Sequence, residues 1–136
     1  MLKTVIAGWA GIAIAFAIID LIWLGRVADA FYRSQLGSLR ADAVNIPAAI
    51  AFYLIMVTGI LVFAVLPAVR AESVWTALGA GAFLGFLCYA TYDLTNLATL
   101  RDWPFLMTFV DLAWGTVLTA IASVAGYYAA RAVSGA

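Results

Sequence analysis

The chain has 136 residues, of which 67% are hydrophobic and 10% are charged, and its mean hydropathy is +1.09. A water-soluble domain contains roughly 45–50% apolar and about 25% charged residues, so this composition excludes a soluble globular fold and indicates a lipid environment. Seven basic residues balance seven acidic ones. A neutral chain has no electrostatic footprint for nucleic acid, which excludes that class of partner.

The numbers of histidine and cysteine residues limit which cofactors the protein can bind. The chain contains no histidine and a single cysteine, Cys88. Histidine is the usual haem ligand and a common zinc ligand, and a disulfide needs two cysteines. The sequence therefore has no haem, zinc or internal disulfide signature. The cofactor stays unknown, and a divalent cation such as Mg²⁺ bound by oxygen ligands is the possibility left open.

The first apolar segment, residues 4–24, is long enough to span a bilayer, which takes about 20 residues. It is too long for the apolar core of a signal peptide, so we expect a membrane helix and not a cleaved leader. The connection that follows, residues 25–45, contains Arg26, Arg33 and Arg40 at a spacing of seven. On a helix that spacing places three side chains on nearly one face.

Part of this connection is expected to be helical, either as an extension of the first helix or as an amphipathic helix lying in the interface. Its three arginines and Arg101 would then face the lipid headgroups. The alternative is a solvated loop whose arginines extend toward water in the ordinary way.

The second apolar segment is expected at residues 46–66. It begins with Pro47 and ends before Pro67. Proline is tolerated in a first helical turn and is common just beyond a helix end, so the two prolines predict the bounds of this helix.

The third and fourth apolar segments are expected at residues 73–100 and 104–130. Ser73 is a plausible N-cap for the third. Asp102 and Pro104 are interpreted as the cap and the first-turn proline of the fourth. Because lipid offers no partners for loose backbone groups, the sequence predicts an all-α integral membrane bundle of four transmembrane helices in a single domain, residues 1–136.

Small residues recur at four-residue spacing on several of these segments, and such pairs let helices approach closely. The pairs are Ala7 with Gly11, Gly81 with Gly85, and Ala122 with Gly126. Four helices put both termini on one side of the membrane. Basic residues divide almost evenly between the two sides, so they do not fix the orientation. This balance also fits an antiparallel homodimer.

Three of the seven acidic residues, Asp20, Asp93 and Asp111, lie inside apolar segments. Each is roughly 8–12 Å from the same end of its helix at 1.5 Å per residue. The first and third helices run toward the face at which the fourth begins, so all three carboxyl groups are expected in one layer. A carboxylate facing lipid costs about 2.5–3.5 kcal/mol or more, so the three should turn inward.

Polar and aromatic residues accompany these acids at helical spacing. Tyr89, Asp93 and Asn96 form one stripe of the third segment. Trp23 and Trp114 follow Asp20 and Asp111 by three positions, in a repeated Asp-Leu-x-Trp pattern. We expect Asn96, Tyr89 and the two tryptophans to complete a ligand, proton or cation site, although packing is the more common role of such tryptophans.

No lysine or arginine lies within the spans to neutralise these acids. Three explanations are open: a protonated carboxyl, a divalent cation held by Asp20, Asp93 and Asp111, or a cationic or hydroxylated ligand. The plain alternative is that the acids are hydrogen-bonding partners between helices, worth about 1 kcal/mol per contact.

Four runs of sequence are distinctive: residues 20–25 (DLIWLG), 31–33 (FYR), 89–104 (YATYDLTNLATLRDWP) and 111–115 (DLAWG). They resemble a bacterial family of small membrane proteins known only as domain of unknown function 2177, over nearly the whole chain. The family pattern includes Asp20, Asp93 and Asp111. The resemblance implies no assigned reaction. Members are often encoded near enzymes that modify membrane fatty acids, which implies a lipid-related role and a multi-pass location in the bacterial cytoplasmic (inner) membrane.

The sequence favours a membrane protein that binds or transports a small or amphiphilic, lipid-related ligand in a carboxylate pocket, with coupling to a proton or cation. The alternative is a membrane enzyme or an accessory subunit in lipid (fatty acid) modification, with the aspartates as acid and base or as metal ligands. No nucleophile elbow or phosphate-binding loop is present in the sequence, so whether the protein is an enzyme stays open.

Overall fold

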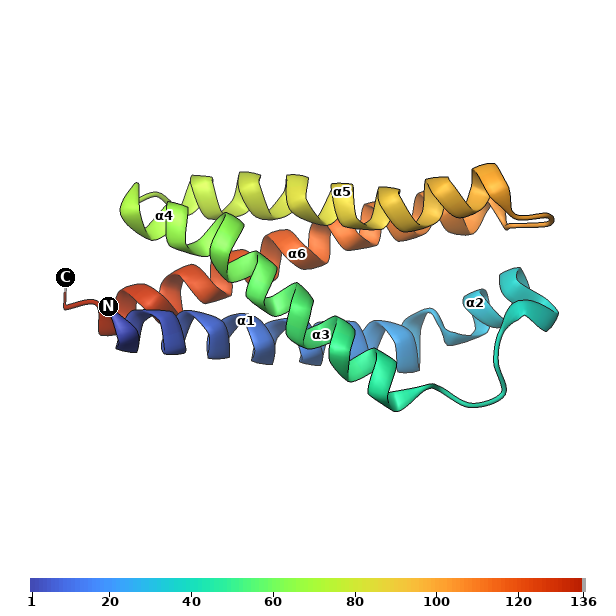
Figure 1. Ribbon diagram of the computed structural model, residues 1–136, viewed down its shortest axis with the longest axis horizontal. Helices are drawn as coiled ribbons and strands as arrows, with labels where there is room; N and C mark the ends of the chain where they lie inside the picture. The colour runs from blue at the N-terminus through green and yellow to red at the C-terminus, as the bar shows by residue number, and fades with distance from the viewer. Residues whose placement is uncertain (136) are drawn as a thin grey trace.

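The computed structural model describes residues 1–135 and folds them into helices joined by short turns (Figure 1). The elements in chain order are α1 (Leu2–Ile22), η1 (Trp23–Val27), α2 (Asp29–Leu36), η2 (Gly37–Leu39), α3 (Ile46–Ile60), η3 (Leu61–Val65), α4 (Leu66–Arg70), α5 (Val74–Thr99) and α6 (Phe105–Val133). Two of them, η1 and η3, are single π-helical turns, and η2 is a 3₁₀ turn.

Within residues 1–135, four continuous helical segments are long and apolar enough to cross a membrane: Leu2–Val27, Ile46–Arg70, Val74–Thr99 and Phe105–Val133. The first joins α1 to η1, and the second joins α3, η3 and α4. The predicted all-α bundle of four transmembrane helices is confirmed.

Pro67 does not end the second spanning helix, so that predicted boundary is wrong. The helix continues to Arg70, with Pro67 in the first turn of α4 directly after the π turn of η3. A proline inside a helix leaves one carbonyl without its usual donor and crowds the preceding turn. The π turn of η3 is wider than an α-helical turn and lies directly before this proline. Such π turns are known as single-turn adjustments inside α-helices.

Helix starts follow the predicted chemistry at two places and depart from it at a third. Ser73 caps α5 by accepting a hydrogen bond from the Thr76 amide at 3.3 Å. Asn45 caps α3 in the same way, with Pro47 in the first turn. Asp102, however, does not cap α6. It has a positive φ of 59° in the turn before the helix, a conformation that aspartate tolerates, and Pro104 takes the N-cap position.

The connection after the first helix is helical in two separate pieces, which corrects the expectation of one arginine face. The first helix extends through η1 to Val27, the chain bends at Ala28, and α2 then runs to Leu36. Arg26, Arg33 and Arg40 therefore lie on η1, on α2 and beyond η2. A seven-residue spacing aligns side chains only along one unbroken helix.

Helix α6 is the centre of the bundle, with α1 packed along one side and α5 along another. Close approach depends on glycine, as the small-residue spacing predicted. A Cβ added to Gly85 of α5 would lie 2.2 Å from the Gly115 carbonyl oxygen of α6, and one added to Gly11 would lie 2.6 Å from Ala129 Cβ. These contacts confirm that Gly11 and Gly85 lie in close helix interfaces.

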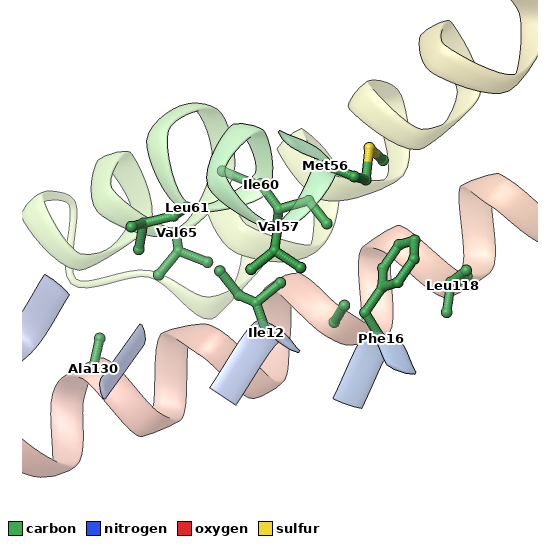
Figure 2. Close-up of a cluster of buried hydrophobic side chains, with 11 residues drawn as sticks. Ile12, Phe16, Met56, Val57, Ile60, Leu61, Val65, Leu118 and Ala130 are labelled. Carbon is green, nitrogen blue, oxygen red and sulfur yellow. The ribbon is translucent and has the colours of Figure 1, made fainter. Parts of the chain in front are cut away.

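Helix α3 crosses the other helices diagonally, so it touches them mainly through its C-terminal half (Figure 1). There the main apolar core forms, where Ile12 and Phe16 of α1 meet Ile60 of α3 and Val65 of η3 (Figure 2). The N-terminal half of α3 leaves Ile46 and Ile50 more than half exposed. The bundle is thus packed at the end that holds the chain termini and open toward the other end.

Candidate functional site

The opening beside the N-terminal half of α3 is a partly open cavity of about 1090 Å³. Residues from α1, η1, α2, the segment after η2, α3, α5 and α6 line it. Its polar lining comes from Asp20, Asp29, Tyr32, Arg40, Tyr53, Tyr89, Tyr92, Asp111 and Trp114. The remainder of the wall is mostly apolar and includes Leu21, Leu24, Ile46, Ile50, Phe52 and Met107. The cavity therefore offers a polar cluster and an apolar wall to the same ligand.

Asp20 lies on this cavity and receives two hydrogen bonds from other helices. The Tyr53 hydroxyl of α3 donates to Asp20 Oδ2 at 2.5 Å, and Trp114 Nε1 of α6 donates to Asp20 Oδ1 at 3.1 Å. The residue is 5% exposed. Both oxygens of the carboxylate therefore have a donor, which is the condition for burying a carboxylate without a cation.

Asp111 lies on the same cavity and is held through α2. The Tyr32 hydroxyl donates to Asp111 Oδ1, and Trp23 Nε1 donates to the Tyr32 oxygen at 3.1 Å. The pKa of Tyr32 is raised, mainly by burial and to a smaller extent by the hydrogen bond to Asp111. This hydroxyl therefore keeps its proton and acts as the donor.

The two tryptophans join these acid clusters. The rings of Trp23 and Trp114 stack with centroids 4.2 Å apart and planes inclined by 9°. Trp114 donates to Asp20, whereas Trp23 reaches Asp111 through Tyr32. The two Asp-Leu-x-Trp motifs are thus connected by hydrogen bonds, because each indole is linked to the aspartate of the other motif.

Asp93 lies behind Asp111 and does not line the cavity. It is fully buried, and within residues 1–135 neither of its carboxyl oxygens has a hydrogen-bond partner. Its carboxyl group is close enough to that of Asp111 for direct interaction. An orphaned buried carboxyl group is rare in folded proteins and calls for a specific cause.

The remaining predicted residues divide between the cavity and the surface. Tyr89 lines the cavity, and its ring covers Gly115, where an added Cβ would lie 2.2 Å from the ring. Asn96 is half-buried on α5 and is not part of the cavity lining. Arg26 and Arg101 are exposed near the helix ends, and their contact with headgroups stays a prediction.

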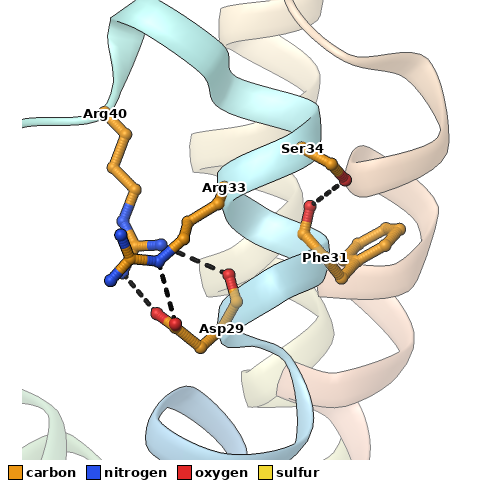
Figure 3. Close-up of polar contacts among 5 residues, drawn as sticks. All are labelled: Asp29, Phe31, Arg33, Ser34 and Arg40. Carbon is orange, nitrogen blue, oxygen red and sulfur yellow. Dashed lines mark hydrogen bonds and ion pairs between the residues drawn. The ribbon is translucent and has the colours of Figure 1, made fainter.

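At the outer end of the cavity, Arg40 and Arg33 converge on Asp29, the first residue of α2 (Figure 3). Arg40 Nη2 lies 2.7 Å from Asp29 Oδ1, and Arg33 Nε lies 2.9 Å from Asp29 Oδ2. Hydrogen bonds from Arg40 and then Arg33 hold the pKa of Asp29 below its usual value. Because Asp29 and Arg40 line the cavity, this ion pair shapes its mouth.

Four polar residues of the cavity lining were missed as site residues by the sequence reasoning: Tyr32, Tyr53, Tyr92 and Asp29. Tyr53 carries a hydroxyl inside an apolar span, which is a weak sign of a polar partner. Tyr32 and Asp29 lie in the connection, where polar residues are ordinary. Only the fold of α2 against α6 brings them to the acids.

The three aspartates do not form a common metal-ligand set. Among the residues that the structure describes, no three His, Cys, Asp or Glu side chains are arranged so that they could hold a metal ion. Asp20 is already bound by Tyr53 and Trp114, whereas Asp93 and Asp111 pair with each other. Among residues 1–135, Asp20, Asp93 and Asp111 therefore do not meet around a common divalent-cation site.

Comparison with known proteins gives one match. The family model described as "Predicted membrane protein (DUF2177)" matches residues 5–128. The chain belongs to this family. No curated protein and no solved structure matches it. The DUF2177 match covers both Asp-Leu-x-Trp motifs and all five helices that line the cavity, so this member is a multi-pass membrane protein whose cavity lies within the family's common region.

Proposed function

We propose that this protein binds an amphiphile in the lateral cavity, with the ligand's polar group beside Asp20 and Asp111 and its apolar chain along the wall. The observation that carries the proposal is the composition of the cavity: two buried acids with their hydroxyl and indole partners, on an otherwise apolar surface. Ligand pockets are typically apolar with a few placed polar groups.

The polar cluster selects for a ligand that donates hydrogen bonds. Asp20 and Asp111 are acceptors, and the only basic residue among the described lining residues is Arg40. Arg40 is engaged by the Asp29 carboxylate and also donates to the Asp29 carbonyl at 3.2 Å. An ammonium or hydroxyl group fits such a cluster, whereas a carboxylate would meet like charge.

The apolar wall and the opening suit a lipid chain. The volume of about 1090 Å³ lies at the upper end of the roughly 300–1,000 Å³ typical of small-molecule pockets. Ile50 and Phe52 of α3 line the cavity and are also 53% and 44% exposed. An amphiphile can therefore enter sideways from the bilayer, past α3.

In this proposal the protein acts in the cytoplasmic membrane of a bacterium and binds a lipid-related molecule there. Movement of the ligand across the membrane would require a path to the opposite face, which a homodimer could provide at 136 residues per protomer. Binding alone needs only the single bundle, and for that reason binding is the function we put first.

One observation favours a second candidate, an enzyme or accessory subunit of lipid modification. Asp111 lines the cavity and its carboxyl group adjoins that of Asp93, and such a pair is a common acid and base. Mass spectrometry of a bound lipid before and after incubation separates the two candidates, because binding alone leaves its mass unchanged.

The binding proposal is tested by thermal unfolding in nanodiscs with dodecylamine, dodecanol and dodecanoate, which share one chain length. We expect the amine to stabilise the protein most, the alcohol less and the carboxylate least. At a hundredfold excess over Kd the stabilisation should be about 2.7 kcal/mol. Equal shifts for all three would contradict selection by the acids, and the absence of any shift would contradict binding.

A matched pair of variants on α3 separates binding in the cavity from general effects on the bilayer. Ala49 lines the cavity, whereas Ala51 is exposed on the same helix and is not part of the lining. Ala49→Trp should abolish the amine-dependent shift because the indole occupies the ligand's volume. Ala51→Trp should retain it.

A further inference from the structure

Asp93 is a buried carboxyl group that the amphiphile site does not explain. It is fully enclosed by protein, it does not line the cavity, and neither oxygen receives a hydrogen bond from residues 1–135. Its carboxyl group interacts directly with that of Asp111, itself 9% exposed. If both carboxyl groups are ionised, they are acceptors only and cannot hydrogen-bond to each other, so Asp93 stays without a partner. A proton on one of them supplies the donor that a hydrogen bond between Asp93 and Asp111 needs.

Among residues 1–135, the titratable groups that interact with this pair or lie beside it include no cation. They are Asp20 of α1, Tyr32 of α2, Tyr53 of α3, and Tyr89 and Tyr92 of α5. The Tyr32 hydroxyl donates its hydrogen bond to Asp111, and the Tyr53 hydroxyl donates its hydrogen bond to Asp20. Two adjoining buried carboxylates without a counter-charge repel each other strongly. A proton shared between them removes that repulsion.

We propose that Asp93 and Asp111 hold one proton between them and that a cationic amphiphile entering the cavity displaces it. The first half stands on the geometry of the pair, and the second half rests on the binding function proposed above. Asp111 faces both the cavity and Asp93, so it is the group through which the ligand and the proton compete.

The ammonium group favours the ionised form of both carboxyl groups, because an opposite charge at contact range stabilises a carboxylate. Before binding, the pair carries one negative charge and one proton. An ammonium group brings one positive charge to Asp111, one proton leaves to water through the open cavity, and the pair then carries two negative charges. The exchange replaces one positive charge by another, so the net charge of the site is unchanged. A neutral alcohol brings no charge and leaves the proton in place.

The shared proton is tested first, without any ligand, by infrared difference spectroscopy in H₂O and D₂O at neutral pH. We expect a protonated-carboxyl C=O band in the wild type that shifts in D₂O and is lost in Asp93→Asn, where Asp111 keeps the Tyr32 donor and ionises. The matched control is Asp20→Asn, which should retain the band because Asp20 already has two donors.

The exchange is tested by calorimetric titration of the wild type with dodecylamine in two buffers that differ in protonation enthalpy. We expect release of about one proton per amine bound and none per dodecanol. Asp93→Asn should still bind the amine and release none. Circular dichroism and size exclusion in detergent establish that both variants are folded before either measurement.

The outcomes separate this inference from the binding function. Absence of the band in the wild type, or its survival in folded Asp93→Asn, overturns the shared proton whether or not amines bind. A band with amine binding and no proton release overturns the exchange alone. A band without amine binding contradicts the function proposed above and the exchange with it, and leaves the shared proton supported.

Discussion

Individual side chains decide the chemistry of this cavity through pairings that cross the bundle. Asp20 of α1 depends on Tyr53 and Trp114, and Asp111 of α6 depends on Tyr32. The hydrogen bonds of each aspartate therefore depend on how at least two helices are placed. A buried carboxylate that loses one partner keeps its desolvation cost, so these donors matter more than their individual hydrogen bonds suggest.

The pH dependence that belongs to this scale concerns Asp29, at the mouth of the cavity. Its folded-state pKa is held below the usual 3.8 by Arg40 and then Arg33. A depressed carboxyl pKa contributes stability that is fully present above the unfolded pKa and is lost as the pH falls through the folded value. We expect the wild type to exceed Asp29→Asn in Tm at pH 5–7, and the difference to shrink as the pH falls below 3.8 through the lower folded-state pKa.

Thermal unfolding in detergent at several pH values measures this difference. Asp42→Asn serves as the control, since Asp42 is exposed in the same connection. A difference between wild type and Asp29→Asn that is constant down to pH 2 would show that the Arg33 and Arg40 pairings do not act through the charge of Asp29.

Whole helices are held together by small residues at the α5–α6 interface. Gly81 and Gly85 of α5 meet Ser123, Thr119 and Gly115 of α6, with no room for a side chain at either glycine. In lipid the helices gain no hydrophobic driving force from association, so close van der Waals packing supplies much of it. This interface holds Tyr89 and Asp93 in register with Asp111.

Two glycine substitutions on α5 should have opposite signs. Gly85→Ala places a Cβ 2.2 Å from the Gly115 carbonyl oxygen, and overpacking of this kind costs about 1–3 kcal/mol. Gly79→Ala meets no atom within 4 Å and should stabilise the helix by about 0.5–1 kcal/mol. Unfolding by SDS titration in mixed micelles measures both. A neutral Gly85→Ala would mean that α5 and α6 lie farther apart.

Residues 1–135 contain four spans, so the two ends of this segment lie on one membrane face and the α1–α3 connection lies at the other (Figure 1). The diagonal course of α3 packs one half of the bundle and opens the other. The main apolar core and the cavity thus lie in different halves of the bundle.

Cysteine labelling from one side of sealed vesicles tests this arrangement in a Cys88→Ala background. We expect Lys3→Cys and Ser134→Cys to react with a membrane-impermeant maleimide from the same side. Ser38→Cys and Asp102→Cys should react only from the opposite side. Labelling of all four positions from both sides would indicate molecules inserted in two orientations, and a split between Lys3 and Ser134 would contradict four spans.

The amino-acid sequence by itself determined the solvent, the four spanning helices and the acids that lie within them. These features depend on local properties: apolar segments of about 20 residues, proline and serine at helix starts, and the high cost of a charge in lipid. The sequence also singled out Trp23 and Trp114, because the Asp-Leu-x-Trp spacing is visible along one chain.

The tertiary structure decided which groups meet. Helical periodicity gives the face on which a side chain lies, but it does not say which helix packs there or where a helix bends. The bend at Ala28 brings Tyr32 to Asp111, and the diagonal course of α3 brings Tyr53 to Asp20. Asp93 pairs with Asp111 and Asp20 pairs with Tyr53 and Trp114 for the same reason: contacts between distant segments follow from packing, and local sequence patterns do not encode them.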